Sequence, residues 1–209
     1  SLALDEPFKP VAAIVGGSKI STKIELLNNL SNKVEYLIIG GAMANTFLSA
    51  QGYGIGISLT EKKMIQTAKE IIQELKYKKC KLVLPLDIVC ANSLNERKEV
   101  QTYRVDCCPI DKMILDIGIQ SQKNIMDIIN KSKTLIWNGP LGAFETPPFD
   151  QGTNNIANYA ANRTSKKQLI SIAGGGDTVS ALKTSASISN FSYVSTAGGA
   201  FLEWLEGKS

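Results

Sequence analysis

Six short apolar runs, separated by longer helical patterns, constrain the fold of this 209-residue chain most strongly. Continuous rather than alternating hydrophobicity is typical of strands that are buried on both faces. The predicted strands are 11–15, 36–39, 81–84, 134–137, 168–172 and 193–195, and the predicted helices are 20–30, 43–51, 60–76, 121–131, 149–162, 179–183 and 200–205. Strands that alternate with helices favour a parallel sheet with helices on both faces. The sequence therefore predicts an α/β protein, a Rossmann-like three-layer α/β/α domain with a six-stranded, mainly parallel sheet.

Two stretches depart from this alternation. The polar region 87–108 is interpreted as a loop or hairpin insertion, placed before an apolar run at 113–115. Residues 1–10 contain two prolines and are interpreted as the remnant of an interdomain linker, so the predicted domain is 11–209. Both ends of the sequence stop abruptly, and we expect that a neighbouring domain is missing.

Composition excludes several classes of function. The net charge of +4, from 23 basic and 19 acidic residues, is too mild and too evenly spread to indicate nucleic-acid binding. The absence of a membrane-length apolar run and of a signal-peptide pattern predicts a cytoplasmic protein with no membrane partner. With no histidine and four cysteines outside any CxxC pattern, the chain lacks the usual zinc sites and the Ser-His-Asp and Cys-His catalytic groups. Its chemistry must use lysines, carboxylates and backbone donors.

Small-residue turns follow five of the six predicted strands. One such turn is explained by the dihedral freedom of glycine. Five of them, at strand ends that meet on one edge of a parallel sheet, favour a backbone-walled groove for a planar base and a polyphosphate. The glycines concerned are Gly16, Gly17, Gly40, Gly41, Gly139, Gly142, Gly174, Gly175, Gly176, Gly198 and Gly199.

The stretch from Gly174 to Thr178 lies between a predicted strand and a predicted helix. The free amides and the positive dipole end of a helix N-terminus favour an anion, and phosphate is the obvious candidate. The alternative is a tight turn in which Asp177 or Thr178 is a plain N-cap. Beside a polyphosphate the carboxylate of Asp177 would require Mg²⁺ between the two, because this ion prefers about one or two carboxylates together with phosphate oxygens.

Two lysines and one glutamate extend this hypothesis. Lys19 and Lys23 open the first predicted helix at positions i and i+4, so their side chains should share a face. Their mutual repulsion would be relieved by an anion between them; the alternative is a pair of solvated surface lysines. Glu145 could accept hydrogen bonds from ribose hydroxyls or be an ordinary surface carboxylate. The Walker A, protein-kinase and dinucleotide-binding patterns are all absent.

Five segments closely resemble the nucleotide-binding, C-terminal half of bacterial-type phosphoglycerate kinase. They are VAAIVGGSKISTK at 11–23, LIIGGAMA at 37–44, WNGPLGAFE at 137–145, GGGDT at 174–178 and STAGGAFLE at 195–203. The resemblance implies a phosphotransferase that binds Mg·ADP or Mg·ATP and transfers a phosphoryl group between 1,3-bisphosphoglycerate and ADP in glycolysis. The family's N-terminal domain, which binds 3-phosphoglycerate, is missing, so the alternative is an isolated nucleotide-binding module without catalytic activity of its own.

The resemblance also implies roles for individual residues. Lys23 would contact the nucleotide phosphates and Lys19 the transferred phosphoryl group, with Gly175 and Gly198 completing the catalytic set, while Asp177 would hold Mg²⁺. The nucleotide would further be bound by Gly16, Gly17, Gly40, Gly41, Leu59, Leu115, Asn138, Pro140, Gly142, Ala143, Glu145, Gly174, Gly176 and Thr178. The sequence departs from the family pattern at Ser18, Ala42, Ile119 and Ala197, none of which replaces a lysine or Asp177 of the predicted site.

Overall fold

A computed structural model describes residues 5–96, 98–185, 187–195 and 198–208. Its main sheet has six strands in the order β3-β2-β1-β7-β8-β9, and every neighbouring pair is parallel. The strands are β1 (Val11–Val15), β2 (Tyr36–Ile39), β3 (Lys81–Val83), β7 (Thr134–Asn138), β8 (Ile170–Gly174) and β9 (Tyr193–Ser195). All six predicted strands are confirmed, with ends that shift by at most two residues.

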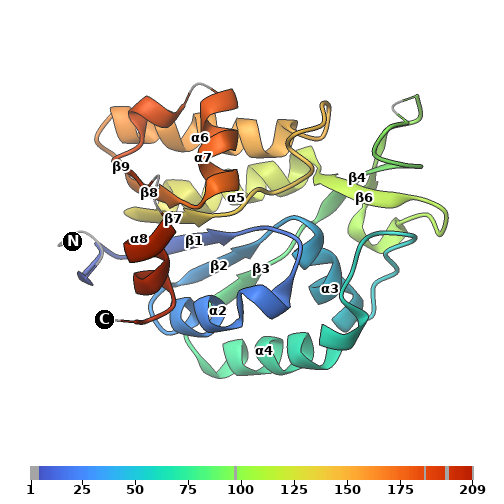
Figure 1. Cartoon of the computed structure of the whole chain (residues 1–209), viewed down its shortest axis with the longest axis horizontal. Helices are drawn as coiled ribbons and strands as arrows, with labels where there is room; N and C mark the ends of the chain where they lie inside the picture. The colour runs from blue at the N-terminus through green and yellow to red at the C-terminus, as the bar shows by residue number, and fades with distance from the viewer. Residues whose placement is uncertain (1–4, 97, 186, 196–197, 209) are drawn as a thin grey trace.

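Helices cover both faces of the sheet, so the predicted three layers are confirmed (Figure 1). Alternate residues of β1 separate the two cores: Ala13 packs on the side of α2, α3, α4 and α8, and Ile14 on the side of α5, α6 and α7. The helices are α2 (Ile24–Ser31), α3 (Ala42–Ala50), α4 (Ile65–Tyr77), α5 (Ile119–Lys131), α6 (Gln151–Ser165), α7 (Gly176–Thr184) and α8 (Gly198–Leu205), with 3-10 turns η1 (Ile20–Thr22), η2 (Lys62–Met64), η3 (Val105–Cys107) and η4 (Ile188–Asn190).

A second, antiparallel sheet occupies the region that broke the sequence pattern. It contains β4 (Asp87–Ala91), β5 (Gln101–Arg104) and β6 (Met113–Ile117) in the order β5-β4-β6. Of the two predicted alternatives, a loop or a hairpin, the structure has the hairpin, formed by β4 and β5, while its pairing with β6 was not predicted. In Figure 1 this small sheet lies on the side of the molecule away from the N-terminus.

Two buried carboxylates attach the small sheet to the helices of the main domain. Asp87 accepts hydrogen bonds from the amides of Gln120 (3.0 Å) and Ser121 (2.8 Å) at the start of α5. Asp116 accepts one from the amide of Gly152 (2.9 Å) at the start of α6. Each carboxylate acts as an N-cap supplied by another element, where the helix dipole favours a negative charge. The small sheet is thereby fixed against the edge of the main sheet.

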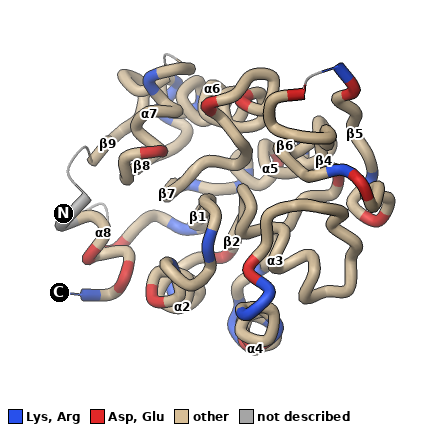
Figure 2. The backbone as a smooth tube through the Cα atoms, turned by 45° about the vertical axis from the view of Figure 1, so that its right-hand side comes forward, with Lys and Arg blue, Asp and Glu red and all other residues tan. Residues whose placement is uncertain are grey.

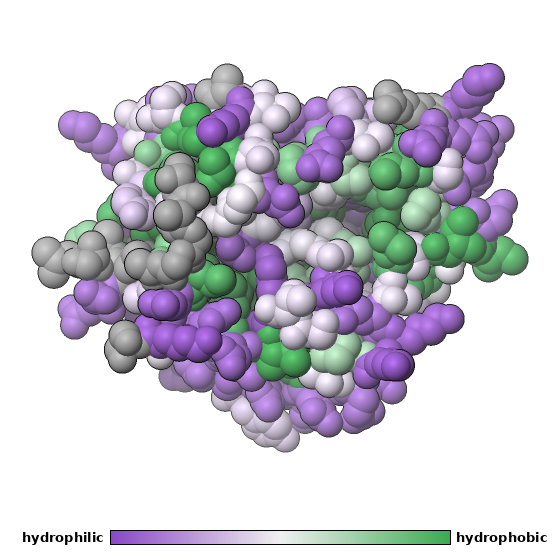
Figure 3. Space-filling view, viewed as in Figure 1, coloured by the Kyte–Doolittle hydropathy of each residue, from purple (hydrophilic) through white to green (hydrophobic). Residues whose placement is uncertain are grey.

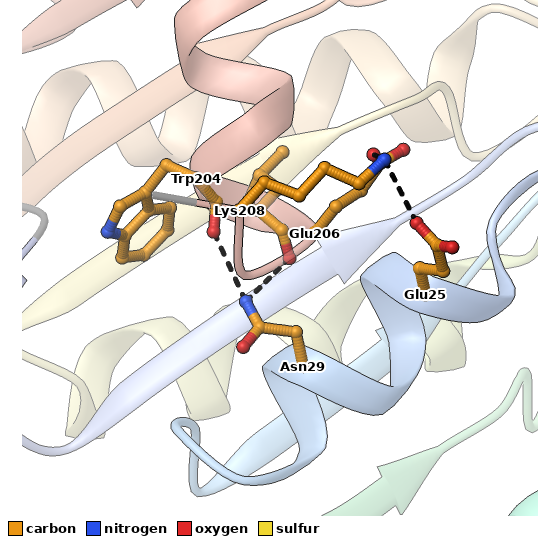
Figure 4. A network of polar contacts seen from close by, with 6 residues as sticks. Glu25, Asn29, Trp204, Glu206 and Lys208 are labelled. Atoms are coloured by element: carbon orange, nitrogen blue, oxygen red, sulfur yellow. Dashed lines mark hydrogen bonds and ion pairs between the residues drawn. The ribbon is translucent and has the colours of Figure 1, made fainter.

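The C-terminal helix α8 is fixed to α2 by a network of polar contacts (Figure 4). The side-chain amide of Asn29 donates to the carbonyl oxygens of Trp204 (3.2 Å) and Leu205 (2.7 Å). Lys208 pairs with Glu25 at 3.2 Å and with Glu206. These contacts satisfy carbonyl groups that a helix C-terminus leaves without intrahelical partners.

Charged residues of both signs are spread along the chain in Figure 2, consistent with the mild net charge of +4. Across the described ranges, no helix combines the length and apolar character needed to cross a membrane.

Candidate functional site

The glycine-containing turns gather at one edge of the main sheet. Because all six strands are parallel, the turns that follow β1, β2, β7 and β8 lie on the same side. Backbone hydrogen bonds join neighbouring turns: the amide of Gly16 donates to Asn138, and that of Gly41 donates to Leu141. The fifth turn begins with Thr196 and Ala197, outside the described residues, and Gly198 is described only as the first residue of α8. The predicted clustering is confirmed for the other four turns.

A cavity of about 390 Å³ lies between these turns and β6 of the small sheet. Figure 3 shows hydrophobic residues at several places on this face, including the right-hand side, where Figure 1 places the small sheet. Among the lining residues Leu59 is 66% and Leu94 38% exposed, so the mouth offers apolar surface to a flat ligand. Half of the predicted nucleotide-binding residues line the cavity: Gly17, Gly41, Leu59, Leu115, Pro140, Gly142, Ala143, Glu145 and Asp177.

The remaining predicted residues lie outside the cavity lining, and some are needed by the fold itself. A Cβ atom on Gly16 would lie 1.8 Å from the carbonyl oxygen of Pro140, and one on Gly40 would lie 2.5 Å from Leu141. A Cβ atom on Gly174 would meet the ring of Phe201 at 2.1 Å. The close approach of other chain segments therefore accounts for these three glycines without any ligand.

The N-terminus of α7 borders the cavity. Gly175 precedes the helix with φ +101°, a conformation that favours glycine, and Gly176 and Asp177 are solvent-exposed. Thr178 is buried, and its hydroxyl accepts a hydrogen bond from the amide of Gly139 (2.7 Å). The side chain of Asn138 donates to the carbonyl of Gly174 (2.9 Å). Asn138 and Thr178 thus hold the β7 turn against α7, whose first amides lack intrahelical acceptors.

Lys23 lies beneath these turns in an environment that disfavours its charge. Its Nζ donates to the carbonyl of Gly16 and to Oδ1 of Asn138 (2.9 Å), both neutral acceptors. Burial lowers the pKa of Lys23 to about 8, and the nearby carboxylate of Asp177 opposes this shift. A half-buried ammonium group is therefore held next to the start of α7, and its pKa of about 8 means that it loses its proton slightly above neutral pH.

Lys19 does not share a helix face with Lys23, so that prediction is wrong. Lys19 has extended backbone (φ −133°, ψ 125°) before the 3-10 turn η1, and α2 begins only at Ile24. The hydroxyl of Thr22 donates to the carbonyl of Lys19, and Ser21 donates to Glu61, which stabilises the tighter turn. Lys19 is exposed, and no hydrogen bond or ion pair of its ammonium group is found in the described part of the chain.

Asp116 is a lining residue that the sequence analysis missed. It is 3% exposed, its two oxygens accept from the amides of Ile117 (2.8 Å) and Gly152 (2.9 Å), and burial raises its pKa to about 7. Gly142 packs directly against its carboxylate. The only available signal was a single carboxylate in the otherwise apolar run 113–117. Ser18, Ala42, Asn45, Pro85, Met113 and Phe144 also line the cavity.

The carboxylates at this edge do not form a metal cage. Within the described ranges no group of three or more His, Cys, Asp or Glu side chains could hold a metal ion. Asp177 and Glu145 both line the cavity and are exposed. A single carboxylate at a helix N-terminus fits Mg²⁺ that arrives with phosphate oxygens, since Mg²⁺ is commonly held by one or two carboxylates plus the phosphates of a substrate.

Comparison with known proteins gives one consistent result. The family model described as phosphoglycerate kinase matches residues 1–208. The chain is 56% identical over 205 residues to phosphoglycerate kinase of Methylorubrum extorquens strain PA1, covering 98% of this chain and 51% of that protein. It is 55% identical over 206 residues to the Bradyrhizobium diazoefficiens protein of the same name, covering 99% and 52%. The chain thus spans about half the length of the curated relatives it matches.

Solved structures agree with the sequence comparisons. Phosphoglycerate kinase from Coxiella burnetii superposes with a TM-score of 0.93 and 44% identity, over 99% of this chain and 52% of that one. The Pyrococcus horikoshii phosphoglycerate kinase, at 22% identity, superposes with a TM-score of 0.80 and shares the fold.

Proposed function

The chain belongs to the phosphoglycerate kinase family, and from this premise we propose that residues 11–209 bind Mg·ADP or Mg·ATP for that enzyme's phosphoryl transfer. The observation that carries the proposal is the position of Lys23. Its half-buried ammonium group donates to two neutral oxygens and lies near Asp177, a lining residue of the 390 Å³ cavity at the amide-bearing start of α7. An anion at this point would compensate the buried charge.

The base of the nucleotide is proposed to enter the cavity between the main sheet and β6. Leu59 and Leu115 supply apolar walls, and Gly41 and Gly142 let the backbone approach a planar ring. Glu145, exposed at the cavity, would accept hydrogen bonds from ribose hydroxyls. The polyphosphate would then extend toward the amides of Gly175 and Gly176, where Asp177 would hold Mg²⁺.

Phosphoryl transfer suits this set of groups, because it depends on in-line positioning and on neutralising charge rather than on a covalent intermediate. Mg²⁺, when bound with the nucleotide, neutralises negative charge on its phosphate oxygens. Lys23 orients the phosphates from below. Lys19 follows β1 and is exposed, and its ammonium group has no hydrogen bond or ion pair within the described residues. We assign to it the phosphoryl group in transfer, together with the backbone of Gly175 and Gly198.

The second substrate is proposed to be 1,3-bisphosphoglycerate, bound by the complementary half of the relatives that this chain does not span. The chain alone would then bind nucleotide without turnover, and a complex with the N-terminal half would make ATP. Turnover by this chain without the other half would contradict this division of roles.

Replacement of Lys19 tests the catalytic assignment. Lys19→Ala should leave the affinity for Mg·ADP within a factor of about two, while the turnover of the reconstituted enzyme falls by about 100-fold or more. The reason is that its charge would be used on the phosphoryl group only in the transition state. Coupled ATP production and calorimetric titration give the two values. Lys131→Ala, at the exposed end of α5, is the charge-matched control and should change neither.

A further inference from the structure

A second hollow lies at the opposite edge of the main sheet from the cavity. It is a surface groove of about 850 Å³, bordered by the residues that precede β1, β7, β8 and β9. Four cationic side chains line it: Lys9, Lys133, Arg163 and Lys167. They come from three separate segments of the chain, so their convergence is produced by the fold rather than by one basic run of sequence.

The charge of this groove is largely uncompensated. None of its lining residues is Asp or Glu. Lys9 has a distant ion pair with Glu35 (3.9 Å), and for Lys133, Arg163 and Lys167 no carboxylate partner exists among the residues that the structure describes. Cations gathered in a hollow repel one another and raise the local concentration of anions.

Arg163 is fixed in place by neutral groups. Its guanidinium donates to Oε1 of Gln168 (3.0 Å) and to the carbonyl oxygen of Asn130 (3.4 Å). These contacts orient the planar side chain but do not neutralise it. An arginine held in this way can still pair with a bound anion. Because the fold already orders its side chain, binding causes a smaller loss of conformational entropy.

Lys167 occupies a position at which glycine is preferred. It is the only non-glycine residue with positive φ (58°) in the described chain. Its amide donates to Thr164, and the amide of Gln168 donates to Arg163, which is the Schellman arrangement that ends a helix. A side chain costs stability in this left-handed conformation, so a lysine here requires a reason that the turn does not provide.

The dipole of α6 explains why some of the cations that line the groove lie near the C-terminus of this helix, since positive charge is favourable there. It does not explain Lys9, which precedes β1, or Lys133, which precedes β7. Phe8 adds an apolar wall, with 70% of its surface exposed and its backbone carbonyl held by the Thr134 hydroxyl (2.7 Å). The geometry points to a second anion site, which binds a small polyanion carrying several linked phosphate groups.

The test uses sodium tripolyphosphate as the probe, without magnesium and at constant ionic strength, and follows backbone amide chemical shifts of the whole chain. We expect saturable shifts at the amides of Lys133 and Lys167, separate from any at residues 174–178. Lys167→Gly should weaken this binding about tenfold, as expected for a lost charge-assisted contact. The same variant should melt at a higher temperature, because glycine suits this turn, so misfolding cannot explain the loss.

Lys166→Ala is the matched control, because it removes an equal charge from the adjacent residue, which does not line the groove. Its affinity for tripolyphosphate should stay within about twofold of the parent, the size expected for a screened surface charge. Equal losses in the two variants would overturn the site, since the general field of the α6 end would then be sufficient. Shifts confined to residues 174–178 would overturn it as well, while leaving the nucleotide proposal intact.

Discussion

At the scale of single residues, two titratable side chains near the proposed nucleotide site have environments that disfavour their charged forms. Lys23 is half-buried among neutral acceptors, and the carboxyl of Asp116 is buried in the cavity wall. Burial lowers the pKa of Lys23 to about 8 and raises that of Asp116 to about 7. Both groups adjoin the proposed nucleotide site, so pH provides a probe of each.

Nucleotide binding should be accompanied by proton uptake near pH 8. A phosphate beside Lys23 favours its ammonium form and raises its pKa, so affinity should fall as pH rises above about 8. Calorimetric titrations of Mg·ADP in two buffers of different ionisation enthalpy measure this uptake. The signal should vanish in Lys23→Met; an uptake of the same size in that variant would show that another group takes the proton.

The free chain should show the opposite dependence on pH. Because the pKa of Lys23 falls from 10.5 to about 8 on folding, the unfolded chain binds more protons between these values. The contribution of Lys23 to stability should therefore rise across this window. Denaturant unfolding of the parent and of Lys23→Met measures the difference in their free energies of unfolding. A difference that stays constant across this pH window would contradict the prediction.

Asp116 should make the protein less stable as pH rises from about 4 to 7. Its pKa is raised from 3.8 to about 7 by folding, so the native state binds the extra proton in this window and its advantage is lost as that proton leaves. The stability of the parent relative to Asp116→Asn should decline across the range in denaturant unfolding. A relative stability that increases with pH would mean that the two backbone amides outweigh burial.

At the scale of elements, the turn before α7 combines structural and proposed binding roles. Gly175 has φ +101°, and a Cβ atom there would lie 2.9 Å from the side chain of Asn138. Gly176 is already helical, and a Cβ atom on it would meet nothing within 4 Å. Alanine substitutions at these two adjacent glycines should therefore change the stability of the domain differently.

Gly175→Ala should destabilise the domain by about 1–2 kcal/mol or more, because alanine tolerates positive φ poorly. Gly176→Ala should instead be neutral or stabilising by up to about 1 kcal/mol, because alanine favours a helix. Chemical denaturation measures both. Similar effects of the two changes would show that this turn is not held in the described conformation.

The main sheet was predictable from sequence because its strands are continuously apolar, as in the fully buried β1. For the region of the small sheet, the sequence predicted only a loop or a hairpin, because β5 (Gln101–Arg104) is polar and mostly exposed and so carries no apolar signal. The helix predicted at 20–30 begins instead with η1, because the Thr22 hydroxyl bonds the carbonyl of Lys19 and Ser21 bonds Glu61, a contact over 40 positions. Local periodicity contains no information about such a partner.

The candidate site was predicted in outline. Asp177 and four of the five glycine turns gather at one edge as predicted, because parallel strands bring their ends there, while the turn after β9 lies outside the described residues. Asp116 was missed because its importance depends on Gly152 and Gly142, which only the folded chain brings to it. The sequence also could not distinguish glycines that leave room for a ligand from those that leave room for another segment of the chain, as Gly16 does for Pro140.

At the scale of the whole molecule, the chain is about half of the phosphoglycerate kinases it resembles, yet it has its own sheet and two hydrophobic cores. The cavity and the α7 turn are formed within this half. We therefore expect nucleotide binding to need no other domain, and we expect phosphoryl transfer to need the half that is proposed to bind the second substrate.

The most direct test of this account is a calorimetric titration of the purified chain with ADP, in Mg²⁺ and in EDTA. We predict saturable one-to-one binding that is tighter with Mg²⁺, and a smaller difference between the two conditions in Asp177→Ala. Absence of saturable binding by the chain, or an effect of Mg²⁺ that is unchanged in Asp177→Ala, would contradict the proposed magnesium-nucleotide site.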